Sequence, residues 1–355
     1  MNPPFAPALL RVAAPSHAPA AARTDDPAHA TPARLPPGRS ARPRLSCVVP
    51  CWNEARNLAL LLPQLDEALQ HCGCDWELIL VDDGSTDGTA ALLAEAALRP
   101  GLRVLQLARN FGKEAALTAG LGAACGEVVL TMDADLQHPP ALIAEMLALW
   151  RRGADMVYAA RSGRADEGLL KRLGAAVFYR LMNAASGVTL PAGAGDFRLM
   201  DRVVVDALLA LPERRRFMKG LYAWVGYDAV ALPYAPPPRA HGRSRFGLWR
   251  LLRLSIDGLT AFSTWPLRAA GLFGGVLALI GFGYGGFVAL QALLYGHPVP
   301  GWTTVIVSLL FLLGVQLVSI GILGEYVGRI FDEVKARPLY VVKRAWGRGL
   351  PSRES

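Results

Sequence analysis

Three apolar runs of this 355-residue chain are each followed by acidic side chains. The runs and the acidic side chains after them are 45–50 with Glu54, 77–81 with Asp82 and Asp83, and 128–132 with Asp133 and Asp135, where Gln137 adds an amide oxygen. If the runs are neighbouring strands, their ends bring these carboxylates to one edge of a sheet, where they repel one another unless a cation compensates. Oxygen ligands select a hard ion such as Mg²⁺ or Mn²⁺. The sequence therefore predicts a divalent metal site at Asp133, Asp135 and Gln137.

Asp82 and Asp83 admit two interpretations. In Asp82-Asp83-Gly84-Ser85 the carboxylates either form a turn and cap the following helix, or they accept hydrogen bonds from the base and the ribose of a nucleotide. The other acidic strand ends favour the nucleotide. Gly120-Leu121-Gly122 is not followed by a third glycine at the offset of a dinucleotide-binding motif, so we do not expect a nicotinamide enzyme.

The elements that must position these residues alternate between strand and helix. The expected strands are 45–50, 77–81, 103–107 and 128–132, and the expected helices run up to residue 69 and over 89–97, 113–124 and 141–150. This alternation predicts an α/β domain with a mostly parallel sheet that is covered on both faces. Ligands of such sheets bind beyond the carboxyl ends of the strands, where the acidic residues lie.

A second part of the chain is apolar enough to cross a bilayer. Residues 269–324 contain no Lys, Arg, Asp or Glu, and the sequence Gly-His-Pro-Val-Pro-Gly at 296–301 interrupts them. This pattern predicts two transmembrane helices, about 269–294 and 300–324. Lys and Arg flank the apolar run on both sides and are missing from the turn, so we expect both termini in the cytoplasm. Residues 246–256 mix Leu and Trp with Arg, which is typical of a helix in the headgroup layer.

Composition adds weaker constraints. The formal net charge of +8 favours an anionic partner, without choosing among a phosphorylated substrate, phospholipid headgroups and nucleic acid. The five cysteines lack the spacing of a zinc site, and we expect them to be reduced thiols. Residues 1–42 are rich in Ala, Pro and Arg and contain no apolar run of signal-peptide length.

These patterns divide the chain into five expected segments. They are a disordered tail at 1–42, an α/β catalytic domain at 43–240, juxtamembrane interfacial helices at 241–267, two transmembrane helices within 268–325, and a cytoplasmic tail at 326–355.

Four ordered motifs carry a resemblance to a known family. They are Cys47-Val-Val-Pro-Cys-Trp-Asn-Glu54, Val81-Asp-Asp-Gly-Ser-Thr-Asp-Gly-Thr89, Arg109-Asn-Phe-Gly-Lys-Glu-Ala-Ala116 and Met132-Asp-Ala-Asp-Leu-Gln-His-Pro-Pro140. With them the chain resembles family 2 glycosyltransferases of the GT-A fold, from Leu45 to Tyr340. Within that family it looks like the polyprenyl-phosphate glycosyltransferases, which include dolichol-phosphate mannosyl synthases and bactoprenol glucosyltransferases. Segments 195–200, 216–221 and 257–263 look most like the bactoprenol branch.

The resemblance implies a Rossmann-like GT-A domain with specific roles for the residues in the motifs. Its nucleotide-sugar pocket would be lined by Pro50, Glu54, Asp82, Asp83 and Asp133, with Asp133, Asp135 and Gln137 at the metal and the diphosphate. Lys113 would lie near the base or the phosphates, and an exposed cation on the first turn of a helix is the alternative. For the acceptor phosphate it implies Arg161, Lys171 or Arg172, Arg243 and Arg245. Positive flanking of the membrane helices explains Arg243 and Arg245 equally well.

Asp135, Asp196 and Arg161 are the catalytic residues that the resemblance implies. Asp196 lies in the segment where relatives with hydroxyl acceptors keep a base, so it would orient the acceptor or the sugar. A structural salt bridge to Arg198 is the alternative. We expect His138 to be a loop residue before Pro139 and not an acid or a ligand.

The implied function is metal-dependent, inverting transfer of a hexose, with UDP-glucose as the preferred donor, to undecaprenyl phosphate at the cytoplasmic face of the inner membrane. A lipid phosphate is largely ionised and needs little help from a base. No nucleic-acid partner is expected, and a homo-oligomer formed through the membrane helices is left open. The alternatives are transfer from GDP-mannose, as in dolichol-phosphate mannose synthases, and a non-catalytic membrane scaffold of the same fold. A processive polysaccharide synthase is disfavoured because the chain has no Gln-x-x-Arg-Trp element.

Overall fold

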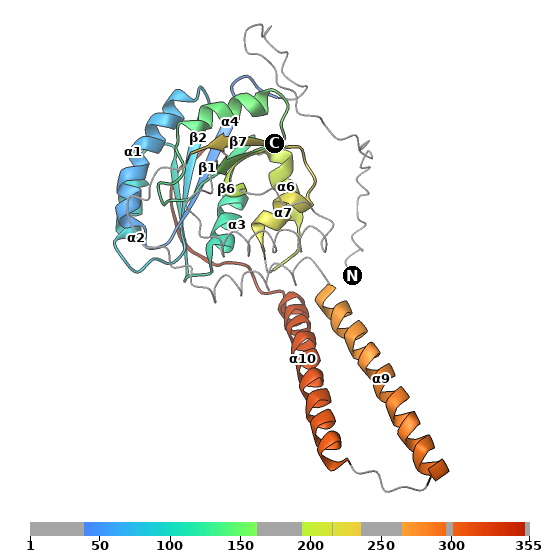
Figure 1. Ribbon diagram of the computed structural model, residues 1–355. Coiled ribbons are helices and arrows are strands. Elements are labelled where there is room, and N and C mark those ends of the chain that lie inside the picture. The colour runs from blue at the N-terminus through green and yellow to red at the C-terminus, as the bar shows by residue number, and fades with distance from the viewer. Residues whose placement is uncertain (1–38, 162–193, 215, 236–264, 296–300, 352–355) are drawn as a thin grey trace, which may run out of the picture. The chain divides into compact units, whose positions relative to one another are not determined.

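The computed structural model describes residues 39–161, 194–214, 216–235, 265–295 and 301–351. The strands in these ranges are β1 Arg44–Cys51, β2 Asp75–Asp82, β3 Leu102–Leu107, β4 Val128–Thr131, β5 Met156–Arg161, β6 Ala194–Asp201, β7 Ala229–Tyr234 and β8 Val342–Gly347. The helices are α1 Ala55–His71, α2 Thr89–Ala96, α3 Lys113–Ala123, α4 Leu142–Arg151, α6 Arg202–Ala210, α7 Met218–Trp224, α9 Trp265–Tyr295 and α10 Trp302–Lys335. Figure 1 labels most of these elements.

The described strands form one sheet in the order β7-β5-β6-β4-β1-β2-β3-β8. The α/β class is confirmed, and the four expected strands are the parallel centre, with β1 between β4 and β2 and with β3 beyond β2. The prediction of a mostly parallel sheet is also confirmed, since β5 and β7 pair in parallel as well, while β6 and β8 pair antiparallel at the two sides of this centre and make the sheet a mixed one. Both strands come from later segments, 194–201 and 342–347, which lie beyond the regular alternation of strand and helix.

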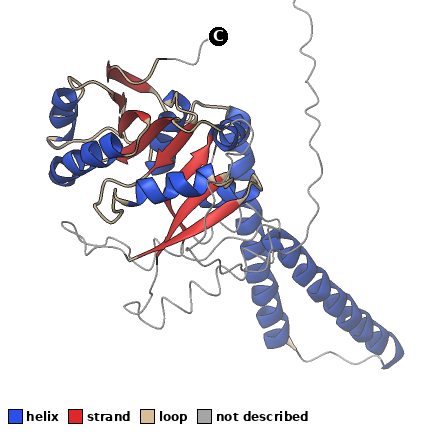
Figure 2. Ribbon diagram, turned by 90° about the horizontal axis from the view of Figure 1, so that it is seen from above, coloured by secondary structure: helices blue, strands red, loops and turns tan. Residues whose placement is uncertain are grey.

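Helices cover both faces of the sheet, which explains why β1 is a continuous apolar run. Cys47 and Val49 face one core cluster together with residues of α1, α2 and α4. Val48 faces the other cluster, to which α3, α6 and α7 contribute. A strand that is buried on both faces loses the apolar and polar alternation of a half-exposed strand. Figure 2 shows the strands in red with helices on both sides of them.

Two described helices are long and apolar enough to cross a membrane. The apolar stretches are Ala269–Val288 in α9 and Phe311–Lys335 in α10, and neither is buried within the protein. Large apolar side chains such as Phe282 and Leu293 are 79% and 83% exposed. Such exposure is costly in water and favourable in hydrocarbon, so these helices associate with a membrane. The segment expected at the interface, 241–267, lies outside the described residues up to residue 264.

The boundaries of the α/β domain differ from the expected 43–240 at both ends. Two parts of the expected C-terminal tail are structured, since α10 continues to Lys335 and residues 342–347 form β8 on the edge of the sheet. At the other end, the Arg39 guanidinium pairs with Asp155 at 3.0 Å and lies over the Trp150 ring, so residues 39–42 belong to the domain. Both differences arise from contacts between residues distant in sequence.

Candidate active site

The loops after β1, β2 and β4 meet at the carboxyl end of the parallel centre of the sheet. β1 pairs in parallel with both β2 and β4, so residues 52–54, 83–87 and 132–138 leave the sheet at the same edge. The Asn53 side chain joins two of these loops, because its Oδ1 accepts hydrogen bonds from the amides of Thr86 and Asp87. Asn53 has a φ of 56°, a left-handed conformation that asparagine tolerates better than most residues. No pattern in the sequence predicts this role of Asn53.

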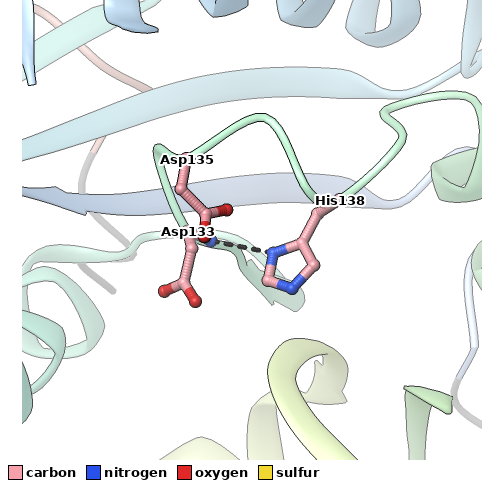
Figure 3. Close-up of side chains that lie close together, drawn as sticks. All are labelled: Asp133, Asp135 and His138. Atoms are coloured by element: carbon pink, nitrogen blue, oxygen red, sulfur yellow. Dashed lines mark hydrogen bonds between the residues drawn. The ribbon is translucent and has the colours of Figure 1, made fainter. Parts of the chain in front are cut away.

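Asp133, Asp135 and His138 form the group that could hold an ion. One ligand atom from each residue lies within 4.8 Å of the others, and the two carboxylates are partly exposed while His138 is buried. Figure 3 shows the three side chains close together on one loop. Leu136 has a φ of 61°, and the Gln137 amide donates to Asp135 Oδ1 at 3.1 Å. This turn brings Asp135 back towards Asp133.

His138 positions the loop, and its protonation argues against a role as a ligand. Its Nδ1 accepts the Asp133 amide at 3.1 Å, drawn as the dashed line in Figure 3. Burial lowers the pKa of His138, so the ring is neutral and its proton lies on Nε2, which leaves no lone pair there for a metal. The ring also stacks on Phe197 at 4.9 Å. The expected loop role of His138 agrees with these contacts, and the two aspartates remain as oxygen ligands.

Lys113 binds two carboxylates at once. It is the first residue of α3, and its Nζ lies 2.6 Å from Asp133 Oδ1 and 2.5 Å from Asp196 Oδ2. Burial would lower the pKa of Lys113, but the two carboxylates raise it above its ordinary value, so the ammonium is retained. The side chain is 43% exposed, as the alternative of an exposed cation on the first turn of a helix expected, and its contact with the base or the phosphates stays a prediction. It is a fixed counter-ion of the acidic cluster.

Asp196, on β6, is paired with Lys113 and not with Arg198. The Arg198 guanidinium donates instead to the Gly195 carbonyl and lies 4.3 Å from the centre of the Tyr222 ring. Burial would raise the pKa of Asp196, but the positive charges of Lys113, Lys219 and Arg198, with Lys113 foremost, outweigh it and lower this pKa. A carboxylate with a lowered pKa is a weak base. Because Asp196 pairs with Lys113 while Arg198 binds the Gly195 carbonyl, a salt bridge to Arg198 is not the structural role of Asp196. That Asp196 orients the acceptor or the sugar stays a prediction.

Asp82 and Asp83 are buried and already bind the protein. Asp82 Oδ1 accepts the Ser85 amide at 2.9 Å and its Oδ2 accepts the side chain of Gln106. Asp83 accepts the amides of Phe111 and Gly112 at 2.7 and 2.9 Å, although burial raises its pKa. Asp82 thus forms a turn with Ser85, which was one of the two interpretations of this motif. Contacts of either carboxylate with a nucleotide stay a prediction.

The turn after β2 packs directly on the loop that leads to Lys113. Gly84 has a φ of 69°, and a Cβ there would lie 2.5 Å from the carbonyl carbon of Arg109. Only glycine fits this approach. Together with the hydrogen bonds to Asp83, it fixes residues 109–112 against the sheet edge.

Pro50 and Glu54 lie where β1 ends. Pro50 is buried within β1 opposite Val81, and Glu54 is partly buried before α1. Burial raises the pKa of Glu54, while a hydrogen bond from Asn57 at 2.6 Å partly opposes this change. Their expected contacts with the nucleotide stay predictions.

Arg161 reaches the metal loop from the end of β5. Its guanidinium donates to Gln137 Oε1 at 2.7 Å, so this oxygen of the third expected ligand binds a protein cation. The ligand role of Gln137 and the acceptor role of Arg161 stay predictions. Lys171, Arg172, Arg243 and Arg245 lie outside the described residues.

The sequence did not predict that the side chains of Glu114 and Tyr222 lie near this cluster. Glu114 follows Lys113 on α3 and accepts the Met218 amide. Its Oε2, the Tyr222 hydroxyl and Asp196 Oδ1 are buried without a hydrogen-bond partner among the described residues. Only the placement of Glu114 beside Lys113, in the third motif, could have pointed to it.

Comparison with known proteins identifies relatives over most of the chain. Residues 46–209 match the family model Glycosyl transferase family 2. An uncharacterized glycosyltransferase of Synechocystis is 43% identical over 85% of this chain and 96% of its own length. The SfII prophage-derived bactoprenol glucosyl transferase of Shigella flexneri is 43% identical over 87% of this chain and its whole length. A prophage bactoprenol glucosyl transferase homolog of Escherichia coli is 40% identical over 85% of this chain and 99% of its own.

Solved structures match more distantly. Mannosyl-3-phosphoglycerate synthase from Rubrobacter xylanophilus is 23% identical with a TM-score of 0.44, over 64% of this chain and 75% of the other. A mannosyltransferase from Pyrobaculum calidifontis, in complex with GDP-Man and Mn²⁺, is 20% identical with a TM-score of 0.42, over 82% and 90% of the two chains. From the matches along nearly the whole length of its relatives at about 43% identity, we conclude that the chain belongs to glycosyl transferase family 2 and is a glycosyltransferase.

Proposed function

We propose that the protein transfers glucose from UDP-glucose to undecaprenyl phosphate, with inversion at the anomeric carbon, at the cytoplasmic face of a bacterial inner membrane. The observation that carries this proposal is the match to three bactoprenol glucosyl transferases, 42% to 43% identical, of which the chain covers 98% to 100%. The similarity extends over at least 84% of this chain, well beyond the residues 46–209 that match the family model. The acceptor class is taken from these relatives.

The donor would bind where the three acidic loops meet. Asp133 and Asp135 offer hard oxygen ligands on one loop, which fits Mg²⁺ or Mn²⁺, and His138 fixes the backbone of that loop. When bound, such an ion supplies Lewis-acid stabilisation of the leaving diphosphate. Asp82 and Asp83 hold the adjacent loops in place for the nucleotide.

Lys113 and Asp196 would align the donor without acting as a base. Among the described residues, two of the three N–H groups of Lys113 bind Asp133 and Asp196, which leaves one for a phosphate oxygen of the donor. The lowered pKa of Asp196 keeps it ionised and paired. Because the acceptor phosphate already carries a negative oxygen, no proton has to be removed before it attacks the anomeric carbon in line with the departing diphosphate.

Arg161 would hold the acceptor phosphate beside the metal loop. Its hydrogen bond to Gln137 fixes one edge of the guanidinium. A guanidinium presents several donors in a plane and meets phosphate oxygens in pairs. The exposure of Arg161 at the end of β5 leaves the group accessible from outside the sheet edge.

The proposal is tested with membranes that contain the protein. Radiolabelled UDP-glucose, GDP-mannose, UDP-galactose and UDP-N-acetylglucosamine are each supplied with undecaprenyl phosphate, and label in the lipid phase is counted. We expect label from UDP-glucose only, and its loss with EDTA and recovery with Mg²⁺ or Mn²⁺. Label from GDP-mannose instead would establish the mannosyl alternative.

Asp135→Asn tests the metal assignment. The amide keeps the shape of the side chain and removes its charge, so incorporation should fall at least about a hundredfold. Glu145→Gln, an exposed change on α4 that removes the same charge, is the matched control and should keep full activity. Undiminished transfer by Asp135→Asn would contradict the role of this carboxylate.

A further inference from the structure

The segment that follows α10 returns to the sheet. It contacts the sheet at the edge that carries the site and also at the opposite edge. We define residues 336–350 as the post-hairpin segment. It begins at Ala336, whose φ of 48° ends α10, and it contains β8. β8 pairs antiparallel with β3, which would otherwise be an edge strand with unpaired backbone groups. Figure 1 shows the chain, in red, continuing from α10 to the α/β domain.

At the site end of β3, this segment holds the start of the loop that carries Lys113. The Val341 carbonyl accepts the Ala108 amide at 2.8 Å, and the pairing of β3 and β8 is irregular between Gln106 and Leu107. Residues 109–112 follow directly, and the amides of Phe111 and Gly112 bind Asp83. The loop is thus held from one side by Asp83 and from the other by the post-hairpin segment.

Tyr340 precedes Val341 and packs against α3, the helix that follows this loop. It packs against the core cluster to which α3 contributes, and Phe111 packs against that cluster as well. A Cβ at Gly122 of α3 would lie 3.6 Å from the Tyr340 hydroxyl, an ordinary contact distance. The ring therefore lies against the helix whose first residue is Lys113.

At the opposite end of the sheet the segment is anchored on a buried carboxylate. The Leu350 amide donates to Glu77 Oε2 at 3.0 Å, and Glu77 Oε1 accepts the Ser46 hydroxyl and the Cys125 amide. Glu77 is fully buried, and a Cβ at Gly349 would lie 2.0 Å from Glu77 Oε2. A side chain at position 349 would therefore displace the Glu77 carboxylate from its hydrogen bonds.

The start of the segment, where it leaves α10, is also anchored by hydrogen bonds to the α/β domain. The carboxylate of Glu333 in α10 accepts the Arg214 amide at 2.8 and 3.1 Å, and the Arg214 guanidinium donates to the Arg337 carbonyl at 2.6 Å. The Arg216 guanidinium donates to the carbonyls of Leu208, Leu211 and Glu213 and so holds the residues that precede Arg214. The end of α10 is thereby tied to the α/β domain.

We infer that the post-hairpin segment is a positioning element of the donor site, in which Tyr340 and Val341 fix the 108–112 loop and so place Asp83 and Lys113. This inference rests on the proposed nucleotide site. It means that the chain after the apolar helices completes the site, although the acidic motifs all precede those helices in sequence. Tyr340 is a positioning residue, since it reaches the site only through α3 and the loop.

Tyr340→Ala tests the inference in the full-length protein in detergent, with Tyr340→Phe as the matched variant that keeps the ring. Hydrogen exchange of the Phe111 and Gly112 amides is followed by mass spectrometry, and binding of UDP with Mg²⁺ is measured by calorimetry. We expect exchange at these amides to become at least about tenfold faster in Tyr340→Ala and the Kd for UDP to rise about tenfold. Amides in β1 should exchange as in the unchanged protein, and Tyr340→Phe should resemble it throughout.

Protected Phe111 and Gly112 amides in a folded Tyr340→Ala protein would overturn the inference, as would a uniform increase of exchange over the whole sheet. If this variant does not fold, Gly349→Val decides, because it releases the far anchor, and Arg348→Val adds the same side chain at an exposed neighbour. Faster loop exchange in Gly349→Val alone supports the inference, and equal exchange in both variants contradicts it. Hydrogen exchange needs no ligand, so failure of the unchanged protein to bind UDP would count against the proposed function only.

Discussion

Individual carboxylates of the site are held by partners from distant parts of the chain. Lys113 joins Asp133 and Asp196, which come from different strands, and it reduces the repulsion that the cluster would otherwise suffer. The arrangement also explains why Asp196 is a poor candidate for a base, since pairing with an ammonium stabilises its charged form. A transferase with an ionised phosphate acceptor can work with such a residue.

Glu114 should make the stability of the α/β domain depend on pH. Burial, followed in size by the charge of Asp196, raises the pKa of Glu114 to about 7. The folded state then binds this proton more tightly than the unfolded state, so the free energy of unfolding falls as the pH rises from about 4.5 to 7. Glu114→Gln removes the ionisation and should stabilise the protein at pH 8 by up to about 3 kcal/mol, since one pKa unit is about 1.4 kcal/mol.

Melting temperatures of the two proteins in detergent at pH 4.5 and pH 8 check this expectation. The difference between them should be large at pH 8 and small at pH 4.5, where Glu114 is protonated. Glu145→Gln, at an exposed position on α4, should show no such pH dependence. A Glu114→Gln protein that melts below the unchanged protein at pH 8 would show that the ionised carboxylate stabilises the fold.

Among the elements, α3 depends on a glycine for its close approach to the sheet. A Cβ at Gly120 would lie 2.2 Å from a methyl group of Val48 and 3.1 Å from one of Val81. Val48 and Val81 belong to central strands, so they cannot easily move away. The short distance between helix and sheet brings Lys113, at the start of α3, to the acidic loops.

Gly120→Ala should therefore destabilise the protein by about 1–3 kcal/mol, the usual cost of overpacking a core. Gly122→Ala is the matched change two residues along the same helix, where the nearest atom would be at 3.6 Å. It should be neutral or stabilise the helix by up to about 1 kcal/mol. Equal melting temperatures for both variants would mean that α3 is free to shift on the sheet.

At the scale of the whole molecule, the residues that flank the two apolar helices predict which side of a membrane the α/β domain faces. Lys and Arg flank the helices on the side of the α/β domain and are missing between them, which predicts that the domain faces the cytoplasm. The orientation is testable with single added cysteines, because four of the five native cysteines are buried and the fifth is partly buried.

In intact spheroplasts, a membrane-impermeant maleimide should label Val299→Cys, which lies between the helices in sequence, and should not label Arg348→Cys. Arg348→Cys, on an exposed residue after β8, should react once the membrane is disrupted. The unchanged protein gives the background from its native cysteines. Labelling of Arg348→Cys in intact cells would reverse the predicted orientation.

The sequence by itself determined the alternation of strands and helices, the four parallel strands, the acidic strand ends and the two apolar helices. Local periodicity and composition carry this information, because burial on one or both faces selects the residue types within each element. The motifs also indicated the family, which the comparisons confirmed.

Only the tertiary structure decided how the side chains are paired and which strands complete the sheet. Lys113 meets Asp196 across 83 residues, and the Leu350 amide meets Glu77 across 273. No local pattern encodes such contacts, because they depend on the packing of several elements around one core. For the same reason the sequence predicted β8 to be part of a tail. Only the tertiary structure shows that β8 pairs with β3 at the edge of the sheet.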